Sequence, residues 1–443
     1  MGKKRKVVIG VDVGTTNIKC FAYDSNASVL GSTCEKIPIL NLEDNKQEIE
    51  PSALWNAFKN VVKTCLSCAQ LSARDISCIG ISSLRGTFVT WNKETGDTYH
   101  NFITWKDKRV VERCDMWNSS ISMKLFRFGA QLLYLITRKN LFQVASVLKF
   151  SSEMVLMRLA WILENYPQIL EDSSQNKVLF GTIDTWLVWK LTGGKIHATD
   201  GSNACVTGFF DPFKMQWAEW MLNFFRIPVN ILPEIKNTSD SYGETFASLF
   251  GESIPIQAVV GDQQASMFGA CCFNKYDISC TMGTGTFLNL NTGNSPPTAH
   301  HGWHIYPLVG WTINSQTTYV AECSVHDTGT VINWAQNLGK FVSKTGPLDT
   351  SSFMGLKIHT SKAHLVKAIL ESFSFQVSIL HEIITRDIVR ENTNVICGGV
   401  AKNDFIVQLI SDLTCQPIIR LKHTETSSLG AAFLAGLYNG NNI

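Results

Sequence analysis

The sequence predicts an α/β fold in two domains, and three observations support this. The chain has 443 residues, more than a single hydrophobic core usually organises. Short β-branched runs alternate along it with longer segments of helical periodicity, as in α/β proteins. A strand followed by a turn rich in glycine and threonine occurs twice, far apart in the sequence, which suggests a duplicated fold. We therefore predict domains at residues 1–255 and 256–443.

The predicted first domain opens with residues 7–13 (VVIGVDV), a continuous β-branched run typical of a buried strand. A tight turn at 14–16 leads into an alternating run at 18–22, so we expect a β-hairpin rather than a strand-to-helix step. Residues 50–67 have apolar side chains at helical spacing, with Pro51 near the start, which predicts a helix. Residues 78–82 predict another buried strand.

The predicted second domain begins with the same pattern. Residues 254–260 read as a buried strand, and we expect this strand to open the second repeat. Residues 281–287 (TMGTGTF) place a second glycine- and threonine-rich turn within a pair of strands. A long helix at about 361–385 and a strand at 395–397 are expected to follow.

Composition excludes several functional classes. With 45% hydrophobic and 17% charged residues the chain is not expected to be disordered, and a net charge of +2 does not indicate nucleic-acid binding. No window of 18 apolar residues lacks charge, so we predict no membrane span. Thirteen cysteines without a signal peptide predict reduced thiols and a cytoplasmic location. Residues 3–6 (KKRK) are interpreted as a solubilising leader, with a nuclear import signal as the alternative.

The most apolar stretch of the chain is 125–163. Basic residues interrupt it at intervals that suit amphipathic helices: Arg138, Lys139, Lys149 and Arg158. Packing into the core is the favoured interpretation. The alternative is peripheral contact with a membrane surface, because basic amphipathic helices can bind one.

The two glycine- and threonine-rich turns suit phosphate binding, because phosphates need closely approaching backbone N–H groups and small hydroxyl side chains. No GxxxxGK[ST] run and no HRD and DFG set is present, so neither a Walker-type nor a protein-kinase site is indicated. Asp12 and Asp262 each end a predicted strand. Two carboxylates beside two phosphate turns suggest that one holds Mg²⁺ while the other takes a proton from an acceptor hydroxyl.

Several segments resemble the FGGY carbohydrate kinases, and among these the glycerol kinases. In that family's order they are 8–19 (VIGVDVGTTNIK), 80–87 (GISSLRGT), 104–109 (TWKDKR), 262–264, 281–287, 351–371 and 398–403. The resemblance covers nearly the whole chain. It implies two ribonuclease H-like domains of the actin-like ATPase type, with the active site in the cleft between them. It also implies phosphorylation of glycerol or a related small polyol by Mg-ATP.

The same resemblance implies residue roles. Asp12 would hold Mg²⁺ through water, and Asp262 would be the general base. The polyol would contact Arg85, Trp105, Asp262, Gln263 and Phe287. ATP would contact Thr15, Thr16, Asn17, Lys19, Thr284, Gly329, Asn333, Gly399 and Asn403. A homo-oligomer is a further expectation from the family.

Two departures from the family pattern bear on activity. Gly86 follows Arg85 where glycerol kinases have Glu, so an acceptor for substrate hydroxyls is lost, and no matching Tyr supplies a third polar contact. Between Trp334 and Phe353 only 18 residues remain where the family has several dozen more, which we expect to weaken stability or activity. The alternative functions are therefore a nucleotide-binding regulatory or scaffold protein with little catalysis, or a plain ATPase.

Overall fold

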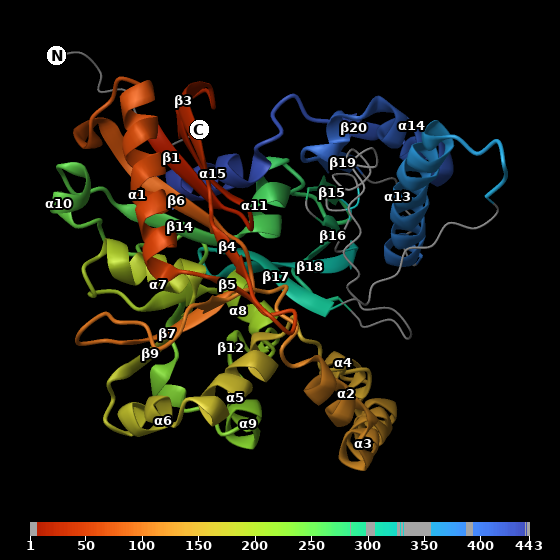
Figure 1. Ribbon diagram of the computed structural model, residues 1–443, viewed down its shortest axis with the longest axis horizontal. Coiled ribbons are helices and arrows are strands. Elements are labelled where there is room, and N and C mark those ends of the chain that lie inside the picture. Colours follow the sequence, from red (N-terminus) through yellow and green to blue (C-terminus); the bar gives the residue numbers. More distant parts are fainter. Residues whose placement is uncertain are drawn as a thin grey trace.

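The structure is a computed structural model that describes residues 7–283, 285–297, 306–325, 328, 331, 356–386, 393–438 and 440. Two mixed β-sheets form its centre, and helices lie around them (Figure 1). One sheet has five strands in the order β14-β6-β1-β2-β3, and the other has six in the order β17-β18-β16-β15-β19-β20. The predicted α/β class is confirmed.

The first sheet contains both strands of the predicted hairpin. Its strands are β1 (Val7–Val13), β2 (Asn17–Tyr23), β3 (Val29–Lys36), β6 (Ile76–Ser83) and β14 (Ile256–Gly261). Strands β1, β2 and β3 pair in antiparallel fashion, whereas β1 pairs with β6, and β6 with β14, in parallel. The buried β-branched runs predicted at 7–13 and 78–82 thus become adjacent parallel strands.

The second sheet repeats this pairing scheme. Its strands are β15 (Ile278–Met282), β16 (Thr286–Gly293), β17 (Tyr306–Ile313), β18 (Gln316–Val325), β19 (Asn394–Cys397) and β20 (Ile418–Arg420). Strands β15, β16 and β18 pair in antiparallel fashion, whereas β15 pairs with β19, and β19 with β20, in parallel. The five-strand pattern of the first sheet therefore recurs, with β17 added at the edge, and the suggested duplication is confirmed at the level of the sheets.

The expectation that residues 254–260 open the second repeat is wrong. Strand β14 is the fifth strand of the first sheet and pairs in parallel with β6. Its sequence has the continuous apolar pattern of a buried parallel strand, which does not specify the sheet that it joins. The domain division at residue 255 stays a prediction, but a cut there would separate β14 from its own sheet.

Two helices lie where the sheets approach each other: α11 (Asp262–Gly269) and α15 (Thr426–Tyr438). The C-terminal helix α15 packs on β1 and β6 of the first sheet, so the chain returns to its first lobe. Glycines allow this approach: a Cβ at Gly10 would lie 2.0 Å from the carbonyl oxygen of Ser428, and one at Gly80 would lie 2.0 Å from that of Ala431. The contact needs glycine on the sheet.

The outer helices of the two sheets match the predictions. Helix α1 (Pro51–Cys68) packs on β2 and β3 and buries Leu54 and Phe58. Helix α13 (Lys362–Thr385) packs on β16 and β18 and contacts α14 (Asp404–Thr414). The helices predicted at 50–67 and about 361–385 are therefore confirmed.

A third, smaller sheet extends the first lobe. Its order is β4-β5-β8-β7-β9, with β4 (Ile39–Asn41), β5 (Gln47–Ile49), β8 (Phe102–Ile103), β7 (Phe88–Asn92) and β9 (Val178–Thr182). Helices α6 (Pro167–Ser174) and α7 (Ile183–Leu191) pack on this sheet. The same part of the chain also forms α5 (Val155–Asn165), α8 (Gly201–Ala204), α9 (Glu219–Phe224) and α10 (Ala247–Phe250). Short paired strands complete the lobe: β10 (Ala198–Asp200), β13 (Glu234–Lys236), β11 (Phe210–Asp211) and β12 (Gln216–Trp217).

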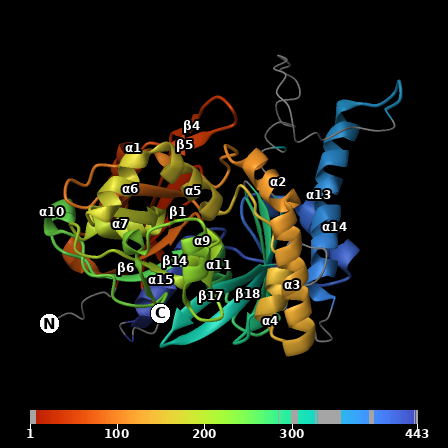
Figure 2. The same cartoon turned by 90° about the horizontal axis from the view of Figure 1, so that it is seen from below.

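Three helices project from the body of the first lobe: α2 (Val111–Ser119), α3 (Ile121–Thr137) and α4 (Asn140–Ser146) (Figures 1 and 2). Core packing, the favoured interpretation of residues 125–163, is right for α5, in which eight of 11 residues are buried. It is wrong for α3, where only Met123 and Ala130 are buried. Among the described residues, no helix combines the length and apolar character needed to cross a bilayer.

Candidate active site

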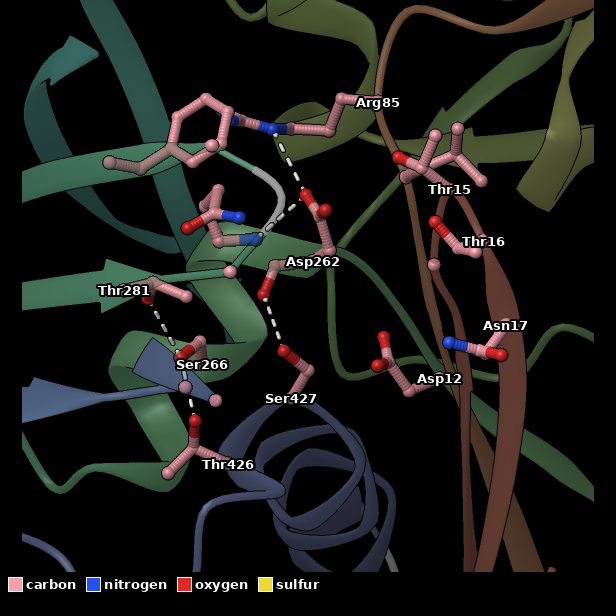
Figure 3. A pocket seen from close by; sticks show the side chains of 18 of the residues that line it. Asp12, Thr15, Thr16, Asn17, Arg85, Asp262, Ser266, Thr281, Thr426 and Ser427 are labelled. Atoms are coloured by element: carbon pink, nitrogen blue, oxygen red, sulfur yellow. Dashed lines mark hydrogen bonds and ion pairs between the residues drawn. The ribbon is translucent and has the colours of Figure 1, made fainter. Parts of the chain in front are cut away.

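A pocket of about 360 Å³ is lined by residues from both large sheets and from α11 and the start of α15. Eleven of the predicted site residues line it: Asp12, Thr15, Thr16, Asn17, Lys19, Arg85, Trp105, Asp262, Gln263, Phe287 and Gly399. Figure 3 shows ten of the lining residues labelled, with Asp12 and Asp262 facing the same space. The fold thus gathers in one cleft residues that are far apart in the sequence.

The first glycine- and threonine-rich turn is fixed by its own backbone and by an aromatic side chain. The Gly14 N–H donates to the carbonyl oxygen of Asn17 at 2.9 Å, which closes the turn between β1 and β2. The indole N–H of Trp105 donates to the Thr15 hydroxyl at 3.1 Å. The predicted phosphate turn and the predicted polyol contact are therefore held together before any ligand binds.

Asp12 lies one residue before the end of β1. Its Oδ1 accepts a hydrogen bond from the Ser82 hydroxyl on the neighbouring strand at 2.9 Å. Burial raises the pKa of Asp12 to about 7, and the charge of Asp262 adds to the increase while Lys19 opposes it. A nearby cation would favour the charged form of this carboxylate and so offset the cost of ionising it in a partly buried place. Asp12 also lies beside a turn suited to phosphate, so its position fits a hydrated Mg²⁺ ion.

Arg85 lies between two carboxylates. Its Nη2 is 2.7 Å from Oε2 of Glu322, and its Nε is 3.3 Å from Oδ1 of Asp262. Nη1 of Arg85 and Oε1 of Gln263 are buried without a hydrogen-bond partner in the described part of the chain. Because buried polar atoms are nearly always paired, one donor and one acceptor here await a polar ligand.

Asp262 is the first residue of α11. Its Oδ1 accepts a hydrogen bond from the N–H of Gln263 at 2.9 Å, and the Ser427 hydroxyl donates to its carbonyl oxygen at 3.1 Å. Burial raises the pKa of Asp262, and Arg85 partly offsets the increase. A carboxylate with a raised pKa is better suited to accept a proton than an ordinary surface aspartate.

A buried network fixes the start of α11. The N–H of Gly261 donates to the Ser202 hydroxyl at 2.8 Å, and that hydroxyl donates to Asp200 at 2.7 Å. Asp200 is fully buried and also accepts from the hydroxyl of Thr238 at 2.8 Å. These groups hold the backbone that carries Asp262, although none of them lines the pocket.

Two aromatic rings form one wall of the pocket. The rings of Trp105 and Phe287 are 6.3 Å apart at 63°, and the Arg85 guanidinium lies 5.9 Å from the Phe287 ring. An apolar wall beside a guanidinium and a carboxylate suits a small ligand with a carbon backbone and hydroxyl groups.

Lys19 forms an ion pair that the sequence does not predict. Its Nζ is 2.5 Å from Oε2 of Glu425, which precedes α15, and the two side chains are 30% and 33% exposed. Lys19 is expected to contact phosphate, so this lysine would have to divide its donors between Glu425 and a phosphate. The pairing links residues 406 positions apart, and no local pattern marks it.

The second-lobe side of the pocket is built from backbone and small side chains. The N–H of Gly283 donates to the carbonyl oxygen of Gly285 at 2.9 Å. Gly398 has φ +95°, and a Cβ there would lie 2.4 Å from the carbonyl oxygen of Met282, so only glycine fits. No atom lies within 4 Å of a Cβ built at Gly399, which leaves open space beside this residue.

Four predicted nucleotide contacts are not placed in the pocket. Thr284, Gly329 and Asn333 lie outside the described residues. Asn403 does not line the pocket; its side-chain oxygen caps α14 by accepting from the N–H of Phe405 at 3.1 Å. The segment between 334 and 353 also lies outside the described residues, so the proposed loss of family sequence there stays a prediction.

Glu322 is the main residue that the sequence analysis missed. It lies on β18, lines the pocket and pairs with Arg85, 237 positions away. Gly86, which stands where glycerol kinases have Glu, has φ +69°. A glutamate would be strained in that conformation. In this chain Arg85 has Asp262 on one side and, from the other lobe, Glu322 on the other.

Comparison with known proteins identifies the family. Residues 7–269 match the N-terminal domain of the FGGY family of carbohydrate kinases, and residues 347–438 match its C-terminal domain. Glycerol kinase 5 of Danio rerio is 41% identical over 468 residues, covering 99% of this chain and 88% of that protein. Glycerol kinase 5 of Homo sapiens is 41% identical, covering 98% and 87%. The zebrafish alignment is longer than the 443 residues of this chain, so part of that relative has no counterpart here.

Solved structures agree. Plasmodium falciparum glycerol kinase with ADP superimposes with a TM-score of 0.81 at 25% identity, covering 98% of this chain and 90% of that one. Gluconate kinase from Lactobacillus acidophilus gives 0.78 at 20% identity with the same coverage, and supports the fold alone. The two-lobed, actin-like fold predicted from the sequence is confirmed, and the chain belongs to the FGGY family of carbohydrate kinases.

Proposed function

We propose that this chain transfers the γ-phosphoryl group of ATP to a hydroxyl of glycerol or a related small polyol. The observation that carries the proposal is the position of Asp262: a partly buried carboxylate with a raised pKa, 3.3 Å from Arg85, in a pocket that also contains the two glycine- and threonine-rich turns. The pocket therefore contains a candidate general base, polar side chains that could bind a small polyol, and turns suited to phosphate.

The chain's own residues account for positioning and proton transfer. Asp262 would accept the proton of the attacking hydroxyl, while Arg85 Nη1 and Gln263 Oε1, both buried without partners, would orient the remaining hydroxyls. Trp105 and Phe287 would pack on the carbon backbone and exclude water. In phosphoryl transfer most of the acceleration comes from such alignment and from charge stabilisation.

Magnesium would be held at Asp12, and the phosphates at residues 14–17 and 283–285. The raised pKa of Asp12 and the nearby Asp262 charge fit a cation at this point. When bound, Mg²⁺ would neutralise charge on the phosphate oxygens.

Glu322 is proposed to determine which polyol is accepted. The family resemblance implies a carboxylate on the residue after the substrate arginine. Gly86 cannot supply one, whereas Glu322 lies 2.7 Å from Arg85 and lines the same pocket. A substrate hydroxyl would then hydrogen-bond to a carboxylate of the second lobe rather than of the first. Because this places the bonded hydroxyl differently, the preferred polyol need not be glycerol.

The test is coupled ADP release by the purified chain with Mg-ATP, with glycerol and with a panel of other small polyols. We expect polyol-dependent release that falls roughly 10²- to 10⁴-fold in Asp262→Asn. Asp412→Asn, on the exposed end of α14 and away from the pocket, is the matched control.

Two outcomes would contradict the proposal. Nucleotide-stabilised melting without turnover on any polyol would support the regulatory or scaffold alternative. Release of ADP that does not depend on a polyol would indicate a plain ATPase.

We further propose a cytoplasmic location, a homo-oligomer, and division into domains at residues 1–255 and 256–443. Microscopy of the tagged chain, light scattering, and limited proteolysis would test them in turn.

A further inference from the structure

Helix α3 presents an apolar stripe to solvent. Ile121, Leu125, Phe128, Leu132 and Leu135 are 76%, 64%, 62%, 45% and 50% exposed, respectively. Their spacing alternates between four and three residues, which places all five on one side of the helix. Contiguous exposed apolar surface of this kind normally marks an interaction site. We call these five residues the hairpin face.

The hairpin formed by α3 and α4 is braced in this position. Opposite the hairpin face, Met123 and Ala130 are buried, and the Ser120 hydroxyl caps α3 by accepting from the N–H of Met123 at 3.2 Å. The Arg127 guanidinium donates to the carbonyl oxygen of Leu148 at 2.8 Å. The exposed stripe therefore belongs to an ordered element with its own internal contacts.

Other exposed aromatic side chains lie on a different side of α3, because Phe126 is offset by one residue from Leu125 and by two from Phe128 on a helix of about 3.6 residues per turn. Phe126 of α3 stacks on Trp220 of α9, with ring centroids 6.1 Å apart. Trp220 is 55% exposed and Phe224 is 58% exposed. These rings therefore form an apolar patch separate from the hairpin face.

The segment that carries the hairpin face has charges of one sign. Residues 116–152 contain five basic residues and no acidic residue. Four of the five are exposed, namely Lys124, Arg138, Lys139 and Lys149, while Arg127 forms the brace. Acidic residues do occur on the neighbouring elements, namely Asp115 on α2 and the exposed Glu219 beside Trp220 on α9.

The charge of α3 also indicates whether a second copy of the chain or a lipid surface binds the hairpin face. A second copy docked on the hairpin face would bring Lys124 and Arg138 of one chain near the same residues of the other, with no acidic side chain on α3 to pair with them. An anionic lipid surface complements the basic residues and accepts the apolar stripe. We propose that the hairpin face binds the surface of an anionic membrane, with α3 lying in its interface.

The test is flotation of the full-length chain with phosphatidylcholine vesicles, with and without one third phosphatidylserine. We expect binding only to the anionic vesicles, weakening as salt is raised. Binding should be lost in Phe128→Glu/Leu132→Glu. It should fall roughly 10- to 30-fold in Lys124→Gln/Lys139→Gln, because each basic residue near an anionic surface contributes a few-fold to the affinity.

The matched control is Ile379→Glu/Ile419→Glu, which charges two side chains that are each 50% exposed but lie in the second lobe. It should bind anionic vesicles like the unmodified chain, and all variants should melt near the same temperature because the substituted groups are exposed. Equal recovery with and without vesicles would overturn the proposal. So would a mass that rises with protein concentration and returns to the monomer in Phe128→Glu/Leu132→Glu, because the hairpin face would then be an interface between copies.

Discussion

Asp12 and Asp262 have the same local setting but different partners. Each lies at the carboxyl end of a buried strand, and β6 separates their strands in the first sheet. Asp12 accepts a hydroxyl hydrogen bond from Ser82, whereas Asp262 begins a helix and lies 3.3 Å from Arg85. Burial raises both pKa values, but only Asp262 has a guanidinium beside it.

The difference indicates how one sheet edge can serve two chemical roles. Within the described part of the chain, the only cationic side chain that lowers the pKa of Asp12 is Lys19, which is already paired with Glu425. This carboxylate is therefore suited to gain a cation, which is the requirement for a magnesium site. A carboxylate oriented by an arginine and a helix N-terminus is held for contact with a substrate hydroxyl. The partners, rather than the strand ends themselves, separate these roles.

The largest expected difference is between the kinetic defects of Asp12→Asn and Asp262→Asn. We expect the loss in Asp262→Asn to persist at saturating Mg²⁺, because the base is gone. In Asp12→Asn, excess Mg²⁺ should restore much of the rate, with a 10- to 100-fold higher requirement, as is common when a group that orients a metal is removed. Titration of Mg²⁺ against ADP release measures both. If both variants responded alike to Mg²⁺, the division of roles would be wrong.

The next expected effect concerns the partners of Arg85. Glu322→Gln removes a charge that lies 2.7 Å from Arg85, and we expect kcat/KM for the preferred polyol to fall about 10-fold or more, since hydrogen bonds to charged groups contribute about 1.5–3 kcal/mol. Gly86→Glu should not restore the rate, because φ at this position is +69° and a side chain there costs about 1–2 kcal/mol.

The discriminating measurement for Glu322 is the polyol panel. A variant with unchanged preference among polyols, and an unchanged melting temperature, would show that Glu322 does not contact the substrate. A restored rate in Glu322→Gln/Gly86→Glu would instead show that the two positions are interchangeable.

A smaller expected effect is on stability as pH changes. Because the pKa of Asp12 is raised to about 7 in the folded chain, its contribution to stability is full below its ordinary value of 3.8 and is lost as pH rises through about 7. Without Mg²⁺, the unmodified chain should therefore lose melting temperature between pH 5 and 8 relative to Asp12→Asn. Asp184, whose pKa burial raises to about 6, changes both proteins equally, so the difference isolates Asp12. Parallel melting curves would contradict the assignment.

Local patterns in the sequence were enough to predict many elements. The strand at 7–13 and the helices α1 and α13 were predicted close to their observed bounds, because β-branched runs and apolar spacing determine them locally. The sheet that β14 joins was not predictable. Its continuous apolar pattern is the same as that of a strand that opens a domain, and only its pairing with β6 assigns it to the first sheet. The exposure of α3 was missed for a similar reason: periodicity gives an apolar face but does not say what covers it.

The residues of the candidate site also fall into two groups: those that a short sequence pattern marks, and those that only a long-range contact identifies. Asp12, Thr15 and Asp262 were predictable because each occurs in a short run whose chemistry is evident from the run itself. Glu322 and Glu425 were not, because each pairs with a residue more than 200 positions away. A single glutamate on a strand or before a helix has no local feature that distinguishes it from a surface residue.

The smallest expected effect comes from the hydroxyls that support the two carboxylates. Ser202→Ala leaves the buried N–H of Gly261 without its acceptor, and we expect a loss of about 1–3 kcal/mol in unfolding free energy with a few-fold lower kcat. Ser82→Ala removes one donor to Asp12, which should raise the pKa of that carboxyl further and increase the Mg²⁺ requirement while kcat at saturating Mg²⁺ stays unchanged. Denaturant unfolding and Mg²⁺ titration of both variants give the comparison. If Ser202→Ala raised the Mg²⁺ requirement as much as Ser82→Ala, the division of roles would be wrong. Asp12 and Asp262 would then act together in binding the metal, because a change near Asp262 would alter Mg²⁺ binding as much as a change near Asp12.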